Sequence, residues 1–352
     1  MEQSKRIFYF DELRALAIIG IVFCHASVAF VLSGVSKSDF YISAFFDCFR
    51  DFSIPIFVML SGALLIGKKD SFKDFFKKRL SRIFIPFGFW VVIYIIYSSI
   101  YITHGFDLSS AIDIFFGTSS TLGVAFWFIW MIIIAYFGIF IINKLMQYNA
   151  WVINILAIIS FVYILIAQFS LFDPYSSKII YFVSFIAYVV FGYFIATNDY
   201  LERKININVL IVSTLALSVL SYFAYIFYFV VPMSISHGQF ITLSYFNLPI
   251  LFISLNIFLF FKFLSKGNLL SQIENNSFGR AITIISKYSF GIYLAHYVIL
   301  HSLRMNIARI IDFTSQSSLI WIPIFVILTT LISLIILTIL NRMQILNNFS
   351  GN

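Results

Sequence analysis

Long apolar stretches, each about the length of a membrane-spanning helix, follow one another along almost the whole chain. A helix that crosses a bilayer needs about 20 mostly apolar residues. The sequence supplies about ten such stretches, at residues 11–33, 46–66, 83–103, 124–143, 151–169, 178–197, 207–230, 241–264, 284–303 and 319–341. This pattern predicts an all-α integral membrane protein with about ten transmembrane helices.

Composition supports the same class. Of the 352 residues, 61% are hydrophobic and only 11% are charged, whereas a soluble domain carries about 25% charged residues. The chain shows no internal repeat and no linker rich in Pro, Gly or Ser. We therefore expect a single transmembrane domain over residues 1–352, with no appended soluble domain.

The N-terminal segment MEQSKRIFYFDELR resembles the basic start of a signal peptide, and Ser27-Val28-Ala29 has the small residues of a cleavage site. The apolar run that follows is nevertheless long enough to span a membrane, and it contains Arg14 and His25. We therefore interpret it as a retained first helix.

The distribution of positive charge predicts the orientation. With ten crossings, 17 of the 23 Lys and Arg residues lie on the N-terminal side, and Arg14 lies within the first helix. The opposite loops carry the other five, which are Lys37, Arg50, Lys178, Arg304 and Arg309. Because cytoplasmic loops are enriched in Lys and Arg, both termini are expected in the cytoplasm. The same rule accounts for the net charge of +8 without a nucleic-acid partner.

Arg14 and His25 are the most unusual residues of the first apolar stretch. Eleven helical residues return to within about 20° of the starting direction and rise roughly 16 Å, so both side chains share one face. Ionisable groups at membrane depth are costly and usually mark a functional site. The alternative is an arginine that snorkels to the headgroups and a histidine hydrogen-bonded within the bundle. Asp11, three residues before Arg14, is placed to form an ion pair with it, and a phosphate is an equal alternative as the partner of Arg14.

His25 is the best candidate for a general base, because its neutral form accepts a proton from a hydroxyl nucleophile. Cys24 points about 100° away around the helix, which disfavours a Cys-His pair. The two cysteines, Cys24 and Cys48, have no metal-binding spacing, and no metal site is predicted.

The basic segment KKDSFKDFFKKRLSRIFIPF, residues 68–87, alternates cationic and apolar residues at helical spacing. Arg79 and Arg82 are three residues apart, a spacing that allows both to bind one phosphate group. An interfacial helix that binds anionic lipid has the same pattern, so both interpretations stay open.

Several other polar and aromatic residues have both a structural and a functional interpretation. Trp127 and Trp130 fit an interfacial belt, and Ser61-Gly62 fits close helix packing. His296, with Tyr293 on the same face and His301 near the outer end of its helix, is either a structural or a second catalytic histidine. The outward loops contain further polar groups that the sequence does not rank, namely His104, Asp107, Asp113, Asp173, His237 and Arg304.

Five segments, in order, resemble one family. FDELRALAIIGIVFCH resembles the opening of the acyltransferase 3 family of bacterial membrane acyltransferases, whose signature of Arg, ten residues and His is matched by Arg14 and His25. PIFVMLSGALL, FKKRLSRIFIPF, FWFIWMIIIAYF and SKYSFGIYLAHYVIL are similar to its second-helix, basic-loop, outer Trp-Phe and ninth-helix segments. The chain departs from the family at His296-Tyr297-Val298, which lacks the proline that often follows the late histidine, and in the fourth stretch, which lacks the proline common near its end.

The resemblance implies an O-acyltransferase, most often an O-acetyltransferase, of the bacterial cytoplasmic (inner) membrane. Its donor would be cytoplasmic acyl-coenzyme A, such as acetyl-CoA, which is a co-substrate and not a permanently bound cofactor. The acceptor would be a hydroxyl of a cell-surface polysaccharide or its lipid-linked precursor. The expected partners are thus the donor, the glycan and membrane lipids, with the oligomeric state open.

In this interpretation Arg79 and Arg82 bind the donor phosphates, and Arg14 lines the path of the pantetheine arm. The predicted catalytic set is His25 as the base together with Arg14 and Asp11. Direct transfer is favoured, although an acyl-enzyme through His25 remains an alternative.

Two rivals come from other classes. A polytopic transporter of glycan or proton would use Arg14 and His25 as a relay without bond formation, although such carriers often show repeated halves. The second rival is a structural partner of a polysaccharide export complex, and such a protein would have no need of Arg14 and His25, which are costly to bury.

Overall fold

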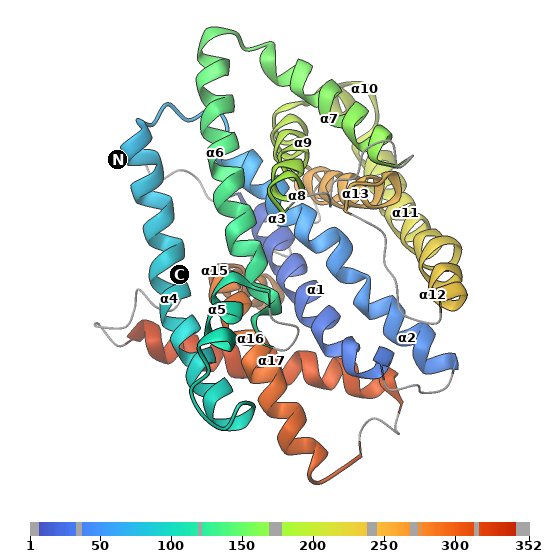
Figure 1. The fold of residues 1–352 in the computed structure, drawn as a ribbon. Coiled ribbons are helices and arrows are strands. Elements are labelled where there is room, and N and C mark those ends of the chain that lie inside the picture. The colour runs from blue at the N-terminus through green and yellow to red at the C-terminus, as the bar shows by residue number, and fades with distance from the viewer. Residues whose placement is uncertain are drawn as a thin grey trace. The chain divides into compact units, whose positions relative to one another are not determined.

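The computed structural model describes residues 7–32, 37–118, 122–168, 178–237, 245–267, 274, 276–312 and 317–342. These residues form helices joined by turns and short connecting segments, and none of them forms a strand (Figure 1). Seven segments are long and apolar enough to cross a membrane: Phe8–Phe30, Ser38–Leu65, Phe72–Tyr101, Gly123–Tyr148, Ile179–Lys204, Ile207–Ile235 and Ser318–Arg342. The predicted all-α, multi-pass membrane protein is therefore confirmed.

The remaining three predicted stretches are helical but do not meet that criterion. Two are shorter apolar helices, α7 (Val152–Gln168) and α13 (Leu248–Leu264). The stretch 284–303 divides between α15 (Ser277–Lys287) and α16 (Ser289–Ala308), and the latter carries two histidines and Arg304. The stretch predicted at 46–66 corresponds to the helix Phe49–Leu65, and the helix Lys37–Asp47 precedes it within the apolar segment Ser38–Leu65. The count of ten crossings and the side of the termini stay predictions.

The chain divides into two compact units that alternate along the sequence, and α1 (Phe8–Leu32) contributes to both. Unit 1 comprises residues 1–17, 48–68 and 141–287. Beyond α7, α13 and α15 it contains α3 (Phe49–Leu65), α8 (Lys178–Ser184), α9 (Ile186–Thr197), α10 (Tyr200–Lys204), α11 (Ile207–Tyr225), the π-helical turn η2 (Ile226–Val230) and α12 (Val231–His237).

Close contact between α3 and α9 forms the centre of unit 1. A Cβ atom added to Gly62 would lie 1.9 Å from the carbonyl oxygen of Val189, and one added to Gly192 would lie 1.9 Å from that of Met59. Only glycine permits the two backbones to approach this closely. The small-residue contact predicted at Ser61-Gly62 is thus confirmed for Gly62.

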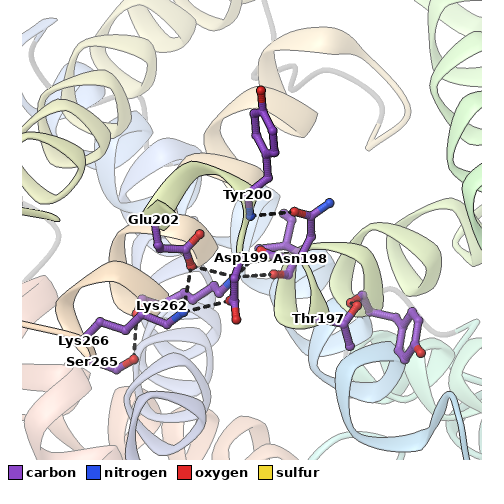
Figure 2. A network of polar contacts seen from close by, with 10 residues as sticks. Thr197, Asn198, Asp199, Tyr200, Glu202, Lys262, Ser265 and Lys266 are labelled. Atoms are coloured by element: carbon purple, nitrogen blue, oxygen red, sulfur yellow. Dashed lines mark hydrogen bonds and ion pairs between the residues drawn. The ribbon is translucent and has the colours of Figure 1, made fainter. Parts of the chain in front are cut away.

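A buried lysine joins α13 to the end of α9 and to α10. The Nζ atom of Lys262, whose side chain is 3% exposed, donates to the backbone carbonyls of Ile195 and Asn198 and forms ion pairs with Asp199 and Glu202 (Figure 2). Carbonyls at a helix C-terminus lack intrahelical donors, and a cation there is favourable. Lys262 therefore caps α9 while its charge is neutralised by the carboxylates.

Unit 2 comprises residues 18–47, 69–140 and 288–352. It contains α2 (Lys37–Asp47), α4 (Phe72–Tyr101), α5 (Leu108–Phe116), the 3₁₀ turn η1 (Gly123–Phe126), the first part of α6 (Trp127–Tyr148), α16 and α17 (Ser318–Arg342). The helices α16 and α17 pack together, and α17 begins against α2, where Ser318 donates to Asp39 through its backbone N–H at 2.9 Å and its hydroxyl at 2.7 Å. This unit positions His25.

The α3–α9 contact gives a stability prediction. Gly62→Ala should lower the thermal unfolding midpoint of the purified protein, because the added methyl group forces apart two packed backbones, at a cost of about 1–3 kcal/mol. Gly88→Ala in α4 is the matched control, since a Cβ there meets no atom within 4 Å. Tryptophan fluorescence during heating measures both midpoints, and equal midpoints for the two variants would contradict the packing argument.

Candidate active site around His25

The structure brings His25 of α1 next to α16. The centroid of the half-buried His25 ring lies 5.2 Å from that of His296 and 5.0 Å from that of Tyr297, whose ring stands nearly perpendicular to it at 88°. The two histidines are far apart in the sequence. The fold of unit 2 therefore brings two imidazole rings and a tyrosine ring together.

His296 is fully buried, with 0% of its surface exposed. Its Nδ1 atom lies 2.6 Å from the backbone carbonyl oxygen of Tyr293, which can only accept a hydrogen bond, so Nδ1 is assigned as the protonated nitrogen. Two residues further on, the Val298 N–H donates to the Tyr94 hydroxyl at 3.2 Å. A proline at this position has no N–H and could not make that contact with α4.

Arg304 fixes the main chain at His25. Its Nη2 atom donates to the backbone carbonyls of His25 at 2.5 Å and Ala26 at 2.8 Å, and its guanidinium lies 5.9 Å from the Phe325 ring centroid. The sequence left Arg304 unranked among the outward-loop residues. In the structure it is a positioning residue, because it holds the turn of α1 that carries the candidate base.

Arg14 lies in the part of α1 that belongs to unit 1. Its Nη1 atom is 3.6 Å from Asp11 Oδ1, so the predicted ion pair is confirmed. The same Asp11 oxygen accepts a 2.6 Å hydrogen bond from Ser286 of α15. Because α1 is helical from Phe8 to Leu32, Arg14 and His25 keep the eleven-residue helical spacing on which their shared face depends.

The thiol of Cys24 contacts the carboxylate of Asp47. Its sulfur lies 3.6 Å from Asp47 Oδ1, and Ser27 donates to the same oxygen at 3.4 Å. Cys24 and Cys48 are both free thiols. Among the described residues no group of three or more His, Cys, Asp or Glu is placed to hold a metal ion.

Arg79 and Arg82 differ in their surroundings although they share α4. Arg79 is paired with Asp70 at 3.2 Å, donates to the carbonyl of Phe75 at 2.9 Å and lies over the Phe75 ring at 3.8 Å. Arg82 is exposed and forms no ion pair with any residue that the structure describes. Of the two, Arg82 is therefore the one whose guanidinium is available to a phosphate.

The other candidates have mainly structural contacts. Trp130 donates to the Phe115 carbonyl at 3.1 Å and so ties α6 to α5, and the Nδ1 atom of His301 lies 3.0 Å from the Tyr97 hydroxyl. Asp107 caps α5, and hydrogen bonds from Ser110 and Ser109 lower its pKa to about 2. Four residues remain of the loops that were predicted to face outward. Asp113 accepts a hydrogen bond from Thr118, and His104 is exposed with a positive φ of 49°. Asp173 and the side chain of His237 lie outside the described residues.

The fold and the site together define a helical, multi-pass membrane protein with a histidine pair and a half-buried arginine nearby. A family model described as an acyltransferase domain matches residues 7–338, and the chain belongs to this acyltransferase 3 family. The predicted resemblance to this family of membrane acyltransferases is confirmed.

The chain is also similar to Nodulation protein NolL of Mesorhizobium japonicum, with 24% identity over 157 residues. That match covers 44% of this chain and 41% of the relative, so it spans less than half of the relative's own length. No solved structure matches the chain.

The contacts of Arg304 lead to a kinetic prediction. Arg304→Ala should lower kcat for acyl transfer about 10-fold, because His25 loses the contact that fixes its backbone and small displacements of catalytic groups are costly. The KM for the donor should change little, and Arg304→Lys should restore part of kcat, since an ammonium group can still bind one carbonyl. Arg309→Ala, which removes an exposed arginine just after the same helix, is the control. A loss of the same size in both alanine variants would argue against a positioning role.

Proposed function

We propose that this acyltransferase moves an acyl group, most often acetyl, from cytoplasmic acyl-coenzyme A to a hydroxyl of a surface polysaccharide or its lipid-linked precursor. The proposed location is the bacterial cytoplasmic membrane. Membership of the family supports the reaction class. The observation that carries the proposal is the position of His25, half-buried on α1, held by Arg304 and next to His296.

In the proposed reaction the acceptor oxygen attacks the carbonyl carbon of the thioester while His25 takes the hydroxyl proton. The C–S bond then breaks, the coenzyme leaves as its thiolate, and His25 returns its proton to solvent or to that thiolate. General-base assistance of this kind typically contributes about 10²- to 10⁴-fold in rate. Direct transfer is favoured over an acyl-cysteine, because the Cys24 thiol is directed to Asp47.

Donor binding is assigned to arginines on two helices. Arg82 is exposed on α4, where a guanidinium and a phosphate form strong charge-assisted hydrogen bonds. Arg79 supports this segment through Asp70 and Phe75. Arg14, paired with Asp11 and about 16 Å from His25 along α1, is proposed to line the path of the pantetheine arm.

One experiment separates this proposal from a transporter. Purified protein is incubated with radiolabelled acetyl-coenzyme A and a panel of lipid-linked glycans, and wild type is compared with His25→Ala and Arg14→Ala. We expect label in the glycan with wild type, at least a 100-fold lower rate with His25→Ala, and a weaker effect of Arg14→Ala. Undiminished transfer by His25→Ala would overturn the assignment of the base. A wild type that moves glycan across vesicles but never transfers label is a transporter.

The role of the basic segment has its own test. Arg82→Ala should raise the apparent KM for the donor about 10-fold, because one charge-assisted contact to phosphate is lost. Lys77→Ala removes an exposed charge from another face of α4 and should leave this KM unchanged. Arg79→Ala should mainly lower thermal stability, and the double variant Arg79→Ala with Arg82→Ala should show the raised KM. If Arg82→Ala and Lys77→Ala behave alike, the segment is a lipid-binding interfacial helix.

A further inference from the structure

His296 presents an acceptor nitrogen inside the protein. Its Nδ1–H is committed to the Tyr293 carbonyl, so the lone pair lies on Nε2, at the far side of the ring. Nε2 is buried and has no hydrogen-bond partner among the described residues. A buried acceptor without a donor costs free energy in the folded state, and each such group in a native protein calls for an explanation.

The surroundings of Nε2 indicate what kind of donor would satisfy it. The centroids of the His25 and His296 rings are 5.2 Å apart, and the Tyr297 ring stands nearly perpendicular to both imidazoles. Arg304, the cation bound near His25, holds carbonyl oxygens of α1. The ligand for Nε2 therefore has to bring its own hydrogen, and it has to fit beside His25 against aromatic rings. A sugar hydroxyl meets both conditions, since sugars commonly pack their C–H faces on aromatic side chains.

We propose that Nε2 of His296 accepts a hydrogen bond from a second hydroxyl of the acceptor, on a carbon next to the one that is acylated. This inference rests on the proposed function, in which His25 deprotonates the reacting hydroxyl. His296 takes no proton in the reaction. It is a specificity-determining residue, and the acceptor class that the pair selects is a vicinal diol such as a hexose offers.

The test compares two kinds of change, one in the enzyme and one in the acceptor. The probes are a lipid-linked hexose and analogues in which single hydroxyls are replaced by hydrogen, with acetyl-coenzyme A as donor. For wild type, kcat/KM should fall about 10-fold for the analogue that lacks the neighbouring hydroxyl. For His296→Leu, which removes the lone pair and keeps a bulky side chain, both acceptors should react at similar rates. This ratio does not depend on how much of a variant is correctly folded.

Two further variants complete the design. His296→Gln places an amide oxygen near the position of Nε2 and should restore part of the discrimination. His301→Leu removes another histidine of α16, whose ring nitrogen already contacts Tyr97, and should keep the wild-type ratio. If label is transferred but the ratio is the same in wild type and His296→Leu, the inference is overturned while the proposed function stands. If no hydroxyl probe is labelled by wild type, the proposed function fails, and the inference fails with it.

Discussion

The need to satisfy buried polar groups inside an apolar protein decides how α1 and α16 are arranged in unit 2. Water is excluded from such an interior, so each donor and acceptor needs a partner in the protein or in its ligand. Nη2 of Arg304 meets part of this need by binding the carbonyls at His25, and Nδ1 of His296 is bound to the carbonyl of Tyr293. The lone pair on Nε2 of His296 has no partner among the described residues, and it is the feature from which we infer where the acceptor binds.

In unit 1, too, buried polar groups have to find partners, but the contacts that achieve this differ from those of unit 2. The contact of α3 with α9 is made by backbones that only glycine allows to approach this closely. Where charge is buried there, as at Lys262, two carboxylates and two carbonyls surround it. Each unit therefore has its own internal ties, and α1 runs through both.

Local spacing made much of this predictable from sequence. The apolar lengths predicted the helices, three-residue spacing predicted the Asp11–Arg14 pair, and a small residue predicted the contact at Gly62. The meeting of His25 with His296 and Arg304 was not predictable, because it depends on which helices are neighbours. The unequal surroundings of Arg79 and Arg82 were also not predicted, since the partner of Arg79, Asp70, precedes the helix and lies outside its i, i+4 pattern. The helix α16 differs from the seven long apolar segments for a related reason, because it carries His296, His301 and Arg304.

The central claim is that neutral His25 is the base in acyl transfer, and the pH dependence of kcat/KM tests it most directly. A base has to be unprotonated, so the wild-type rate should fall at acidic pH and level off at higher pH. In His25→Gln the remaining slow rate should lack that acidic limb. The same limb in wild type and His25→Gln would contradict the account, because the titrating group would then be another residue.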